Sequence, residues 1–220
     1  MKNKKVIILL GPPGAGKGTQ VRLLKEKFGF EVIGSGKMLR KRREKKDFTG
    51  QKIASYIDQG KRVATPIIFN MWMNRMEKIQ QNDFLKGFII DGSPRSKDEA
   101  QMLESALEWY EWANKKKVIF IKLSSQQSLN RLTKRRMCKK CGRLIPYLEG
   151  FKDLKKCDKC GGELVLRKDD NIKGIKQRLA WFKTDVMPSV NYYKKKGELI
   201  EINGDQSIEN VHKDILKALR

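Results

Sequence analysis

The sequence has a single histidine, His212, among its 220 residues, so chemistry that depends on a histidine base or ligand is disfavoured. Long apolar runs are absent as well, since none approaches the roughly 20 residues that a helix needs to span a bilayer. The first five residues include three lysines and lead directly into an apolar run, which leaves no room for a cleavable signal peptide. We therefore expect a soluble, cytoplasmic protein built on one sizeable core, with no membrane partner.

Acidic residues are few relative to basic ones, 25 against 49, and the formal net charge is +24. Such a charge favours anionic ligands and is compatible with salt-sensitive contacts with nucleic acid. The lysines, however, are spread along the chain in groups such as 41–46, 115–117 and 194–196, and they are not interleaved with aromatic residues. We expect a mainly solvated basic surface and no specific nucleic-acid partner.

The four cysteines form two Cys-x2-Cys pairs separated by fifteen residues. In a cytosolic chain this pattern indicates a metal site before disulfides, because each tight turn directs two thiolates at one ion. Four thiolates complete a tetrahedral Zn²⁺ site and leave no position for a reactive water, so the zinc is expected to be structural; iron or another soft metal is the alternative. Glycines after each pair are expected to relieve crowding at the metal. The predicted ligands are Cys138, Cys141, Cys157 and Cys160.

Residues 11–20 read Gly-Pro-Pro-Gly-Ala-Gly-Lys-Gly-Thr-Gln and follow the apolar run of residues 6–10. A buried strand, a glycine-rich loop and a lysine that opens a helix together form a cradle for a polyphosphate, because the backbone N–H groups and the positive end of the helix face the anion. Lys17 is expected to reach the β/γ oxygens, and Thr19 to bind Mg²⁺. The general pattern has the hydroxyl directly after the lysine, whereas Gly18 intervenes here.

The order of apolar runs predicts an α/β fold. Strand-like runs occur at 6–10, 88–91, 117–123 and 198–202, with a shorter one at 30–33, and helical stretches separate them. This alternation favours right-handed crossovers and a parallel sheet covered by helices on both faces. Two stretches interrupt it: residues 35–65 are typical of short helices, and residues 137–167 hold the cysteines and several polar turns. We expect both at the carboxyl edge of the sheet, where such folds bind ligands.

Four further segments, in order, resemble the adenylate kinase family of nucleoside monophosphate kinases. Residues 35–40 (Ser-Gly-Lys-Met-Leu-Arg) resemble its Thr-Gly-Asp-Met-Leu-Arg, and residues 91–95 (Asp-Gly-Ser-Pro-Arg) its Asp-Gly-Phe-Pro-Arg. The arginines of residues 131–136 precede the cysteine unit in the way that arginines precede the mobile lid of the family. Residues 157–178 resemble the end of the lid and the segment after it in zinc-bearing members. With the phosphate loop, the resemblance covers nearly the whole chain. It implies a core of residues 1–34, 66–136 and 168–220, a monophosphate-binding insertion at 35–65, and a zinc-binding lid at 137–167.

The resemblance implies transfer of the γ-phosphoryl group of Mg·ATP to a nucleoside monophosphate, by a monomer. Such transfer needs positioning and positive charge more than covalent chemistry, and arginines supply permanent, bidentate donors. The implied catalytic residues are Lys17, Arg95, Arg131, Arg135, Arg167 and Arg178. The implied ATP contacts are Gly14, Ala15, Gly16, Lys17, Gly18, Thr19, Arg131, Arg135 and Gln206. The implied monophosphate contacts are Ser35, Arg40, Lys61, Arg62, Val63, Gly92, Ser93, Pro94, Arg95, Glu99, Arg167 and Arg178. Thr19 is expected to ligate the magnesium and Asp91 to hold it from the outer sphere, and Asp169 and Asp170 to pair with lid arginines or position the magnesium shell.

Three positions depart from the family pattern: its aspartate is Lys37, its phenylalanine is Ser93, and its adenine-reading glutamine is Glu99. An ionised carboxylate only accepts hydrogen bonds, so Glu99 keeps a contact with the amino group of adenine and loses the donor to the ring nitrogen. The accepting carboxylate of Glu99 would also suit the two hydrogen-bond donors of guanine. In a further interpretation, Glu99 is solvated and makes no contact with the base. AMP is the expected acceptor, with GMP, CMP and UMP left open.

A second class of function is a nucleic-acid-associated ATPase that uses the basic surface and the cysteine unit as a zinc ribbon. Arg40 and the two paired arginine sets, 131/135 and 167/178, argue against it, because a plain ATPase needs no second phosphate site.

Overall fold

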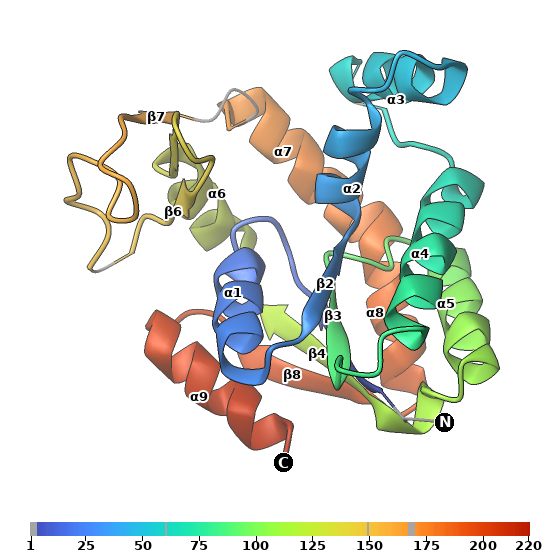
Figure 1. The fold of residues 1–220 in the computed structure, drawn as a ribbon. Helices are drawn as coiled ribbons and strands as arrows, with labels where there is room; N and C mark the ends of the chain where they lie inside the picture. The colour runs from blue at the N-terminus through green and yellow to red at the C-terminus, as the bar shows by residue number, and fades with distance from the viewer. Residues whose placement is uncertain (1–3, 60, 149, 167–169) are drawn as a thin grey trace.

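The central sheet is parallel throughout, with the strand order β2-β3-β1-β4-β8 (Figure 1). The computed structural model describes residues 4–59, 61–148, 150–166 and 170–220. The strands are β1 (Lys5–Leu10), β2 (Glu31–Gly34), β3 (Gly87–Asp91), β4 (Lys116–Lys122) and β8 (Leu199–Asn203). Each lies within one or two residues of a run predicted from the sequence, so the predicted parallel α/β sheet is confirmed.

Helices cover both faces of this sheet, which explains why its inner strands β1, β3 and β4 are buried over most of their length. In β1 the side chains alternate: Val6, Ile8 and Leu10 belong to one buried cluster, and Ile7 and Leu9 to the other. The first cluster packs under α4 (Thr65–Gln80), α5 (Lys97–Trp109) and α8 (Met187–Lys195). The second packs under α1 (Lys17–Phe28) and α9 (Ile208–Ala218), which lie together on the opposite face (Figure 1). The single histidine, His212, lies in α9.

The first interruption of the alternation contains two short helices, α2 (Ser35–Arg42) and α3 (Phe48–Asp58). The helix α2 begins at the residue after β2, at the carboxyl edge of the sheet. Asp47 caps α3, because its side chain accepts a hydrogen bond from the backbone N–H of Gly50. The expectation of short helices in this stretch is confirmed.

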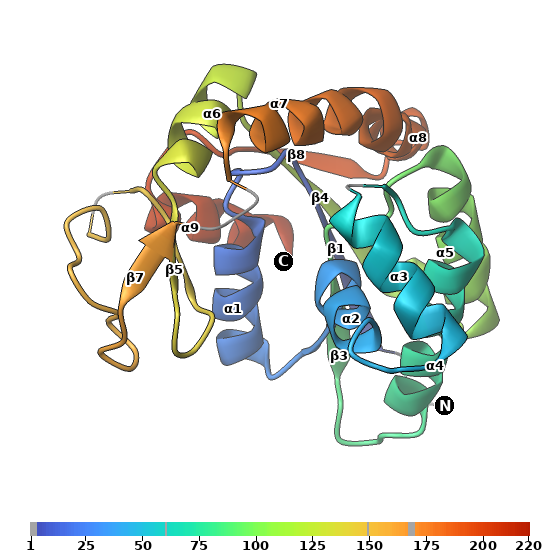
Figure 2. The same ribbon diagram turned by 90° about the horizontal axis from the view of Figure 1, so that it is seen from above.

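The second interruption contains a small antiparallel sheet with the order β6-β5-β7. Its strands are β5 (Arg136–Cys138), β6 (Leu144–Ile145) and β7 (Leu164–Leu166). The chain enters it through α6 (Ser125–Thr133) and leaves it toward α7 (Ile172–Trp181), so it follows a helix and does not follow β4 directly. This sheet and α3 lie on opposite sides of α1 in both views (Figures 1 and 2).

Two further segments complete the described chain. A short 3₁₀ helix (Ala113–Lys115) leads into β4, and a π-helical segment (Phe182–Val186) joins α7 to α8. Segments of π-helix within longer helices are often found at functional sites. Among the described residues, no helix has the length and apolar character needed to cross a membrane.

Candidate nucleotide-binding site

The phosphate loop connects β1 to α1, and its glycines adopt conformations that other residues disfavour. Gly14 and Gly16 have φ angles of +87° and +86°. At Gly11 an added Cβ would lie 2.7 Å from the carbonyl oxygen of Ile121, so a side chain would collide with β4. Gly16 is the N-cap of α1 and offers no side-chain cap, so the first N–H groups of this helix have no side-chain partner at the cap. These groups suit an anion.

Lys17 turns its ammonium group back over this loop. Its Nζ donates hydrogen bonds to the carbonyl oxygens of Gly11, at 2.6 Å, and Pro12, at 3.0 Å. Burial lowers the pKa of Lys17 to about 8, opposed by the charge of Asp91 and assisted by those of Arg95 and Arg135. The lysine therefore lies in a desolvated place where positive charge gathers, and an anion there would be attracted strongly.

Asp91 ends β3 beside β1, where its partner in the sheet is Leu9. Burial raises the pKa of the Asp91 carboxyl, and the positive charges of Lys17, Arg95 and Arg40 oppose that rise. Next in the chain, Gly92 has a φ of +66°, and a Cβ built on it would lie 3.9 Å from Cε of Lys17. The loops that follow two adjacent parallel strands thus meet at Lys17, as the carboxyl edge of such a sheet predicts.

Arg95 lies in the loop after β3, and Glu99 lies in the first turn of α5, which follows that loop. The Nε of Arg95 donates to the carbonyl oxygen of Gly92 at 3.0 Å, and its backbone N–H donates to Oε2 of Glu99 at 2.6 Å. The Glu99 side chain is only 3% exposed, and its Oε1 accepts a hydrogen bond from Arg62 at 3.4 Å. The interpretation that Glu99 stays solvated is therefore wrong, because a backbone donor and a guanidinium satisfy the buried carboxylate.

Ser35 and Ser93, from α2 and the loop after β3, form a buried hydroxyl pair. Their Oγ atoms are 2.6 Å apart, and Nε1 of Trp72 donates to Oγ of Ser35 at 3.0 Å. Serine at position 93 thus gives the buried Ser35 hydroxyl a second partner within the protein. The peptide bond from Ser93 to Pro94 is cis. The sequence gives no signal for this chain of hydrogen bonds, because its members are 37 and 58 residues apart.

Three arginines from the two ends of the cysteine-rich unit are held by carboxylates. Asp170 accepts two hydrogen bonds from Arg135, at 2.8 and 2.9 Å, and a further one from Arg178. Although burial acts in the other direction, these two guanidinium groups lower the pKa of Asp170. Arg131 donates to Asp205 at 3.4 Å. The pairing expected for Asp170 is confirmed, whereas Arg167 and Asp169 lie outside the described residues.

The other predicted contact residues occupy loops and helix ends around this centre. Arg40 is exposed on α2, and its charge acts on both Asp91 and Arg95. Val63 is partly buried against the core, and Lys61 is exposed. The Nε2 of Gln206 donates to Asp214 of α9 at 2.7 Å and to the carbonyl oxygen of Asn203. The remaining phosphate-loop residues differ in exposure: Ala15 is buried, Thr19 half-buried and Gly18 exposed.

The four cysteines form one cluster, with all Sγ atoms within 4.8 Å of one another. The backbone N–H of Cys141 donates to Sγ of Cys138 at 3.4 Å, and mainly for this reason the pKa of Cys138 falls to about 6. A set of sulfur donors at this spacing, one of them readily ionised, fits a soft metal ion.

Crowding at this cluster is confirmed only for Gly162, where a Cβ would lie 2.9 Å from Sγ of Cys138. For Gly142 and Gly161 that expectation is wrong, because nothing lies within 4 Å of a Cβ built there. Their φ angles of +69° and +66° explain the glycines instead.

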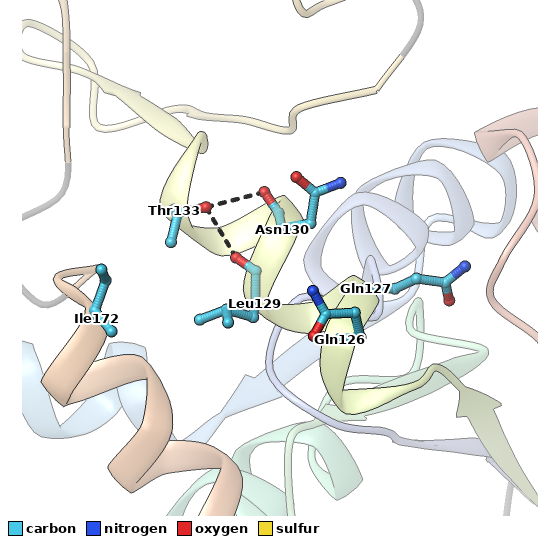
Figure 3. Close-up of a pocket in the computed structure, with 6 residues that line it drawn as sticks. All are labelled: Gln126, Gln127, Leu129, Asn130, Thr133 and Ile172. Atoms are coloured by element: carbon cyan, nitrogen blue, oxygen red, sulfur yellow. Dashed lines mark hydrogen bonds between the residues drawn. The ribbon is translucent and has the colours of Figure 1, made fainter.

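A hollow of about 310 Å³ lies between α6 and α7, the two helices that carry Arg131 and Arg178 (Figure 3). Its lining consists of Gln126, Gln127, Leu129, Asn130, Thr133 and Ile172. The hydroxyl of Thr133 donates to the carbonyl oxygens of Leu129 and Asn130 within α6. Because this lining carries no charged side chain, the hollow does not suit a phosphorylated ligand.

A phosphate loop on a parallel sheet, with arginines from separate elements around its lysine, defines a P-loop nucleotide-binding protein. A family model described as adenylate kinase matches residues 9–198. An adenylate kinase of Archaeoglobus fulgidus is 39% identical over 95% of each chain. Those of Methanocella arvoryzae and Caldicellulosiruptor bescii are 39% and 37% identical over at least 97% of each chain. The chain belongs to the adenylate kinase family.

Proposed function

We propose that this protein is an adenylate kinase, which transfers the γ-phosphoryl group of Mg·ATP to AMP and gives two molecules of ADP in a reversible reaction. One observation carries the proposal. Lys17 of the phosphate loop lies within electrostatic reach of Asp91, Arg95 and Arg135, and Gly92 approaches its side chain closely. Positive groups from separate elements therefore surround one point, which suits a phosphoryl group in transit between two nucleotides.

The roles follow from the chemistry of each group. Lys17 and the backbone N–H groups of the phosphate loop bind the β- and γ-phosphates of ATP. Arg40 and Arg95 bind the phosphate of AMP, since Arg95 is half-buried and Arg40 acts on it electrostatically. Arg135 and Arg178, already aligned by Asp170, stabilise the charge on the transferring group. Little covalent chemistry is needed, so no general base is assigned.

Magnesium fits this arrangement. The hydroxyl of Thr19 is a hard oxygen ligand at the start of α1, and Asp91 is a carboxylate beside Lys17. When bound, the ion would neutralise part of the phosphate charge. The described residues supply these two oxygen donors, and Mg²⁺ ordinarily completes its shell with water and phosphate.

We also propose that the cysteine cluster holds one structural Zn²⁺. Four sulfurs within 4.8 Å of one another satisfy tetrahedral coordination, and this set leaves no position for a substrate. The ion would tie the turn at 138–141 to the turn at 157–160 and so hold the small antiparallel sheet together.

We further propose that residues 35–65 and 137–167 close over the two nucleotides, because closure excludes the water that would otherwise accept the phosphoryl group.

The test is formation of ADP by the purified protein from Mg·ATP with each nucleoside monophosphate in turn. We expect rapid ADP formation with AMP, and slower formation with GMP, CMP and UMP. If ATP is hydrolysed at the same rate with and without every monophosphate, the protein is an ATPase and the proposal is overturned.

A further inference from the structure

The guanidinium of Arg62 connects two carboxylates from distant parts of the chain. Arg62 lies between α3 and α4, and its Nη1 donates to Oδ2 of Asp185 at 2.8 Å. Its Nη2 donates to Oε1 of Glu99 at 3.4 Å. Asp185 belongs to the π-helical segment between α7 and α8, and Glu99 to the first turn of α5. Two charged contacts at different nitrogens fix the orientation of the guanidinium plane.

The members of this group differ in exposure. The Glu99 side chain is 3% exposed, whereas the Arg62 side chain is 33% exposed. The carboxylate thus lies inside, and the guanidinium extends from it toward the surface. A guanidinium has about five N–H donors, so several are left beyond the two bonds above. Within the described part of the chain, Oε1 of Glu99 accepts from Arg62 and Oε2 from the backbone of Arg95, and a carboxylate oxygen has two lone pairs with which to accept.

This pair lies beside the arginine that we assign to the monophosphate. Glu99 accepts the backbone N–H of Arg95 at 2.6 Å. The charges of Glu99 and Arg62 also act on the guanidinium of Arg95, whose pKa is lowered mainly by burial. A nucleotide whose phosphate is bound at Arg95 therefore has two groups close by, the accepting carboxylate of Glu99 and the donating guanidinium of Arg62 beside it.

We infer that Glu99 and Arg62 form an acceptor–donor pair that selects a 6-aminopurine as the acceptor base, and that Asp185 is a positioning residue for Arg62. This inference rests on the proposed function and specifies how its AMP site recognises the base. Adenine presents an exocyclic amino donor next to a ring-nitrogen acceptor. Glu99 accepts from the amino group, and Arg62 donates to the ring nitrogen. Arg62 thus supplies the hydrogen-bond donor that the Glu99 carboxylate lacks.

The same pair rejects a 6-oxopurine. Hypoxanthine and guanine carry a carbonyl oxygen where adenine carries its amino group. This oxygen would face an ionised carboxylate that cannot donate, which is an unfavourable contact between two acceptors. A glutamine at this position would turn its amide and donate to the oxygen. In the presence of Arg62, Glu99 thus favours AMP over GMP, opposite to the preference that an isolated carboxylate suggests.

The experiment compares kcat/KM for AMP and for inosine monophosphate (IMP), with Mg·ATP as donor, in the full-length wild type and in variants. In Glu99→Gln the AMP-to-IMP ratio should fall about 10-fold or more, because a charged hydrogen-bond partner is exchanged for an adaptable one. Arg62→Met should lose about 10-fold or more in kcat/KM for AMP, mainly through KM. The matched control is Arg43→Met, which removes an exposed pair with Asp58 in the same segment and should leave both values unchanged.

The positioning role of Asp185 has its own readout. Asp185→Asn should raise the KM for AMP severalfold with little change in kcat, and the effect should disappear in the Arg62→Met background. An unchanged AMP-to-IMP ratio in both Glu99→Gln and Arg62→Met, with circular dichroism showing folded proteins, would overturn the inference and leave the proposed function intact. A wild type that forms no ADP with AMP would overturn both.

Discussion

Asp170 provides a sharp test of how Arg135 and Arg178, the two arginines that we propose stabilise the transferring group, are held. Its side chain is 1% exposed and binds Arg135 through two hydrogen bonds and Arg178 through a third. In Asp170→Asn the charge is lost and the amide directs an N–H group at donors, so two guanidinium groups lose their counterion. The substitution keeps the volume of the side chain, and its effect therefore reports charge and hydrogen bonding.

The loss of stability expected for Asp170→Asn depends on how exposed the arginine side chains are. Removing one partner of a fully buried ion pair costs about 3–5 kcal/mol. Here the arginine side chains are 16% and 22% exposed, so water partly solvates them once the carboxylate is gone. We therefore expect the free energy of unfolding at pH 7 to fall by about 2–3 kcal/mol. Because the folded pKa of Asp170 lies below the ordinary 3.8, this stability is complete above pH 3.8 and is lost as the pH falls through the folded pKa.

The assay is urea unfolding followed by tryptophan fluorescence at pH 7 and at pH 3.5. The matched control is Asp158→Asn, which removes a carboxylate from a more exposed pair with Arg143 in the cysteine-rich unit and should cost less than about 1 kcal/mol. If Asp170→Asn costs no more than this control, or if its cost grows as the pH falls, the carboxylate does not hold the arginines as argued.

Three further predictions follow from the same geometry. Lys17→Met should leave the protein folded and lower phosphoryl transfer about 100-fold or more, since it removes the charge at the β/γ oxygens; activity within tenfold of wild type contradicts the assignment. Elemental analysis should find one Zn²⁺ per chain, and its removal, or Cys157→Ser, should lower the melting temperature before it lowers activity at low temperature; an unchanged melting curve argues against a structural metal. Gly50→Ala should destabilise the protein by about 1–3 kcal/mol in urea unfolding, because the new Cβ would lie 2.1 Å from the carbonyl oxygen of Lys45. Wild-type stability in that variant would mean that the start of α3 adjusts without cost.

The features predicted correctly from the sequence are those set by local pattern. The runs that became β1, β3 and β4 are apolar at every core position because helices cover both faces of the sheet. The phosphate loop is recognisable because its glycines and Lys17 occupy fixed offsets. The cysteine pairs are recognisable for the same reason, and their sulfurs do cluster. Each of these signals lies within about two dozen residues of sequence, where periodicity and spacing carry the information.

The features that were missed depend on contacts between distant residues. The lysines are expected to form a mainly solvated surface, yet Lys4 is buried and its Nζ donates to the carbonyl oxygens of Asn82 and Leu85, both at 2.7 Å. The pairing of Arg62 with Glu99 spans 37 residues, and that of Arg62 with Asp185 spans 123. No periodicity encodes such pairs. The role of Glu99 was therefore open in the sequence, because it depends on a donor supplied from another element.

The net charge of +24 gives these pairs a common explanation. In a chain with a large excess of positive charge, arginines that surround an anion-binding site repel one another. Without a counterion, each would turn toward water. Asp170 holds Arg135 and Arg178, and Asp185 and Glu99 hold Arg62. Such pairs add little net stability once desolvation is counted. We propose that these pairs keep the guanidinium groups oriented before the nucleotides arrive, so that less ordering remains to be done when the substrates bind and transfer begins.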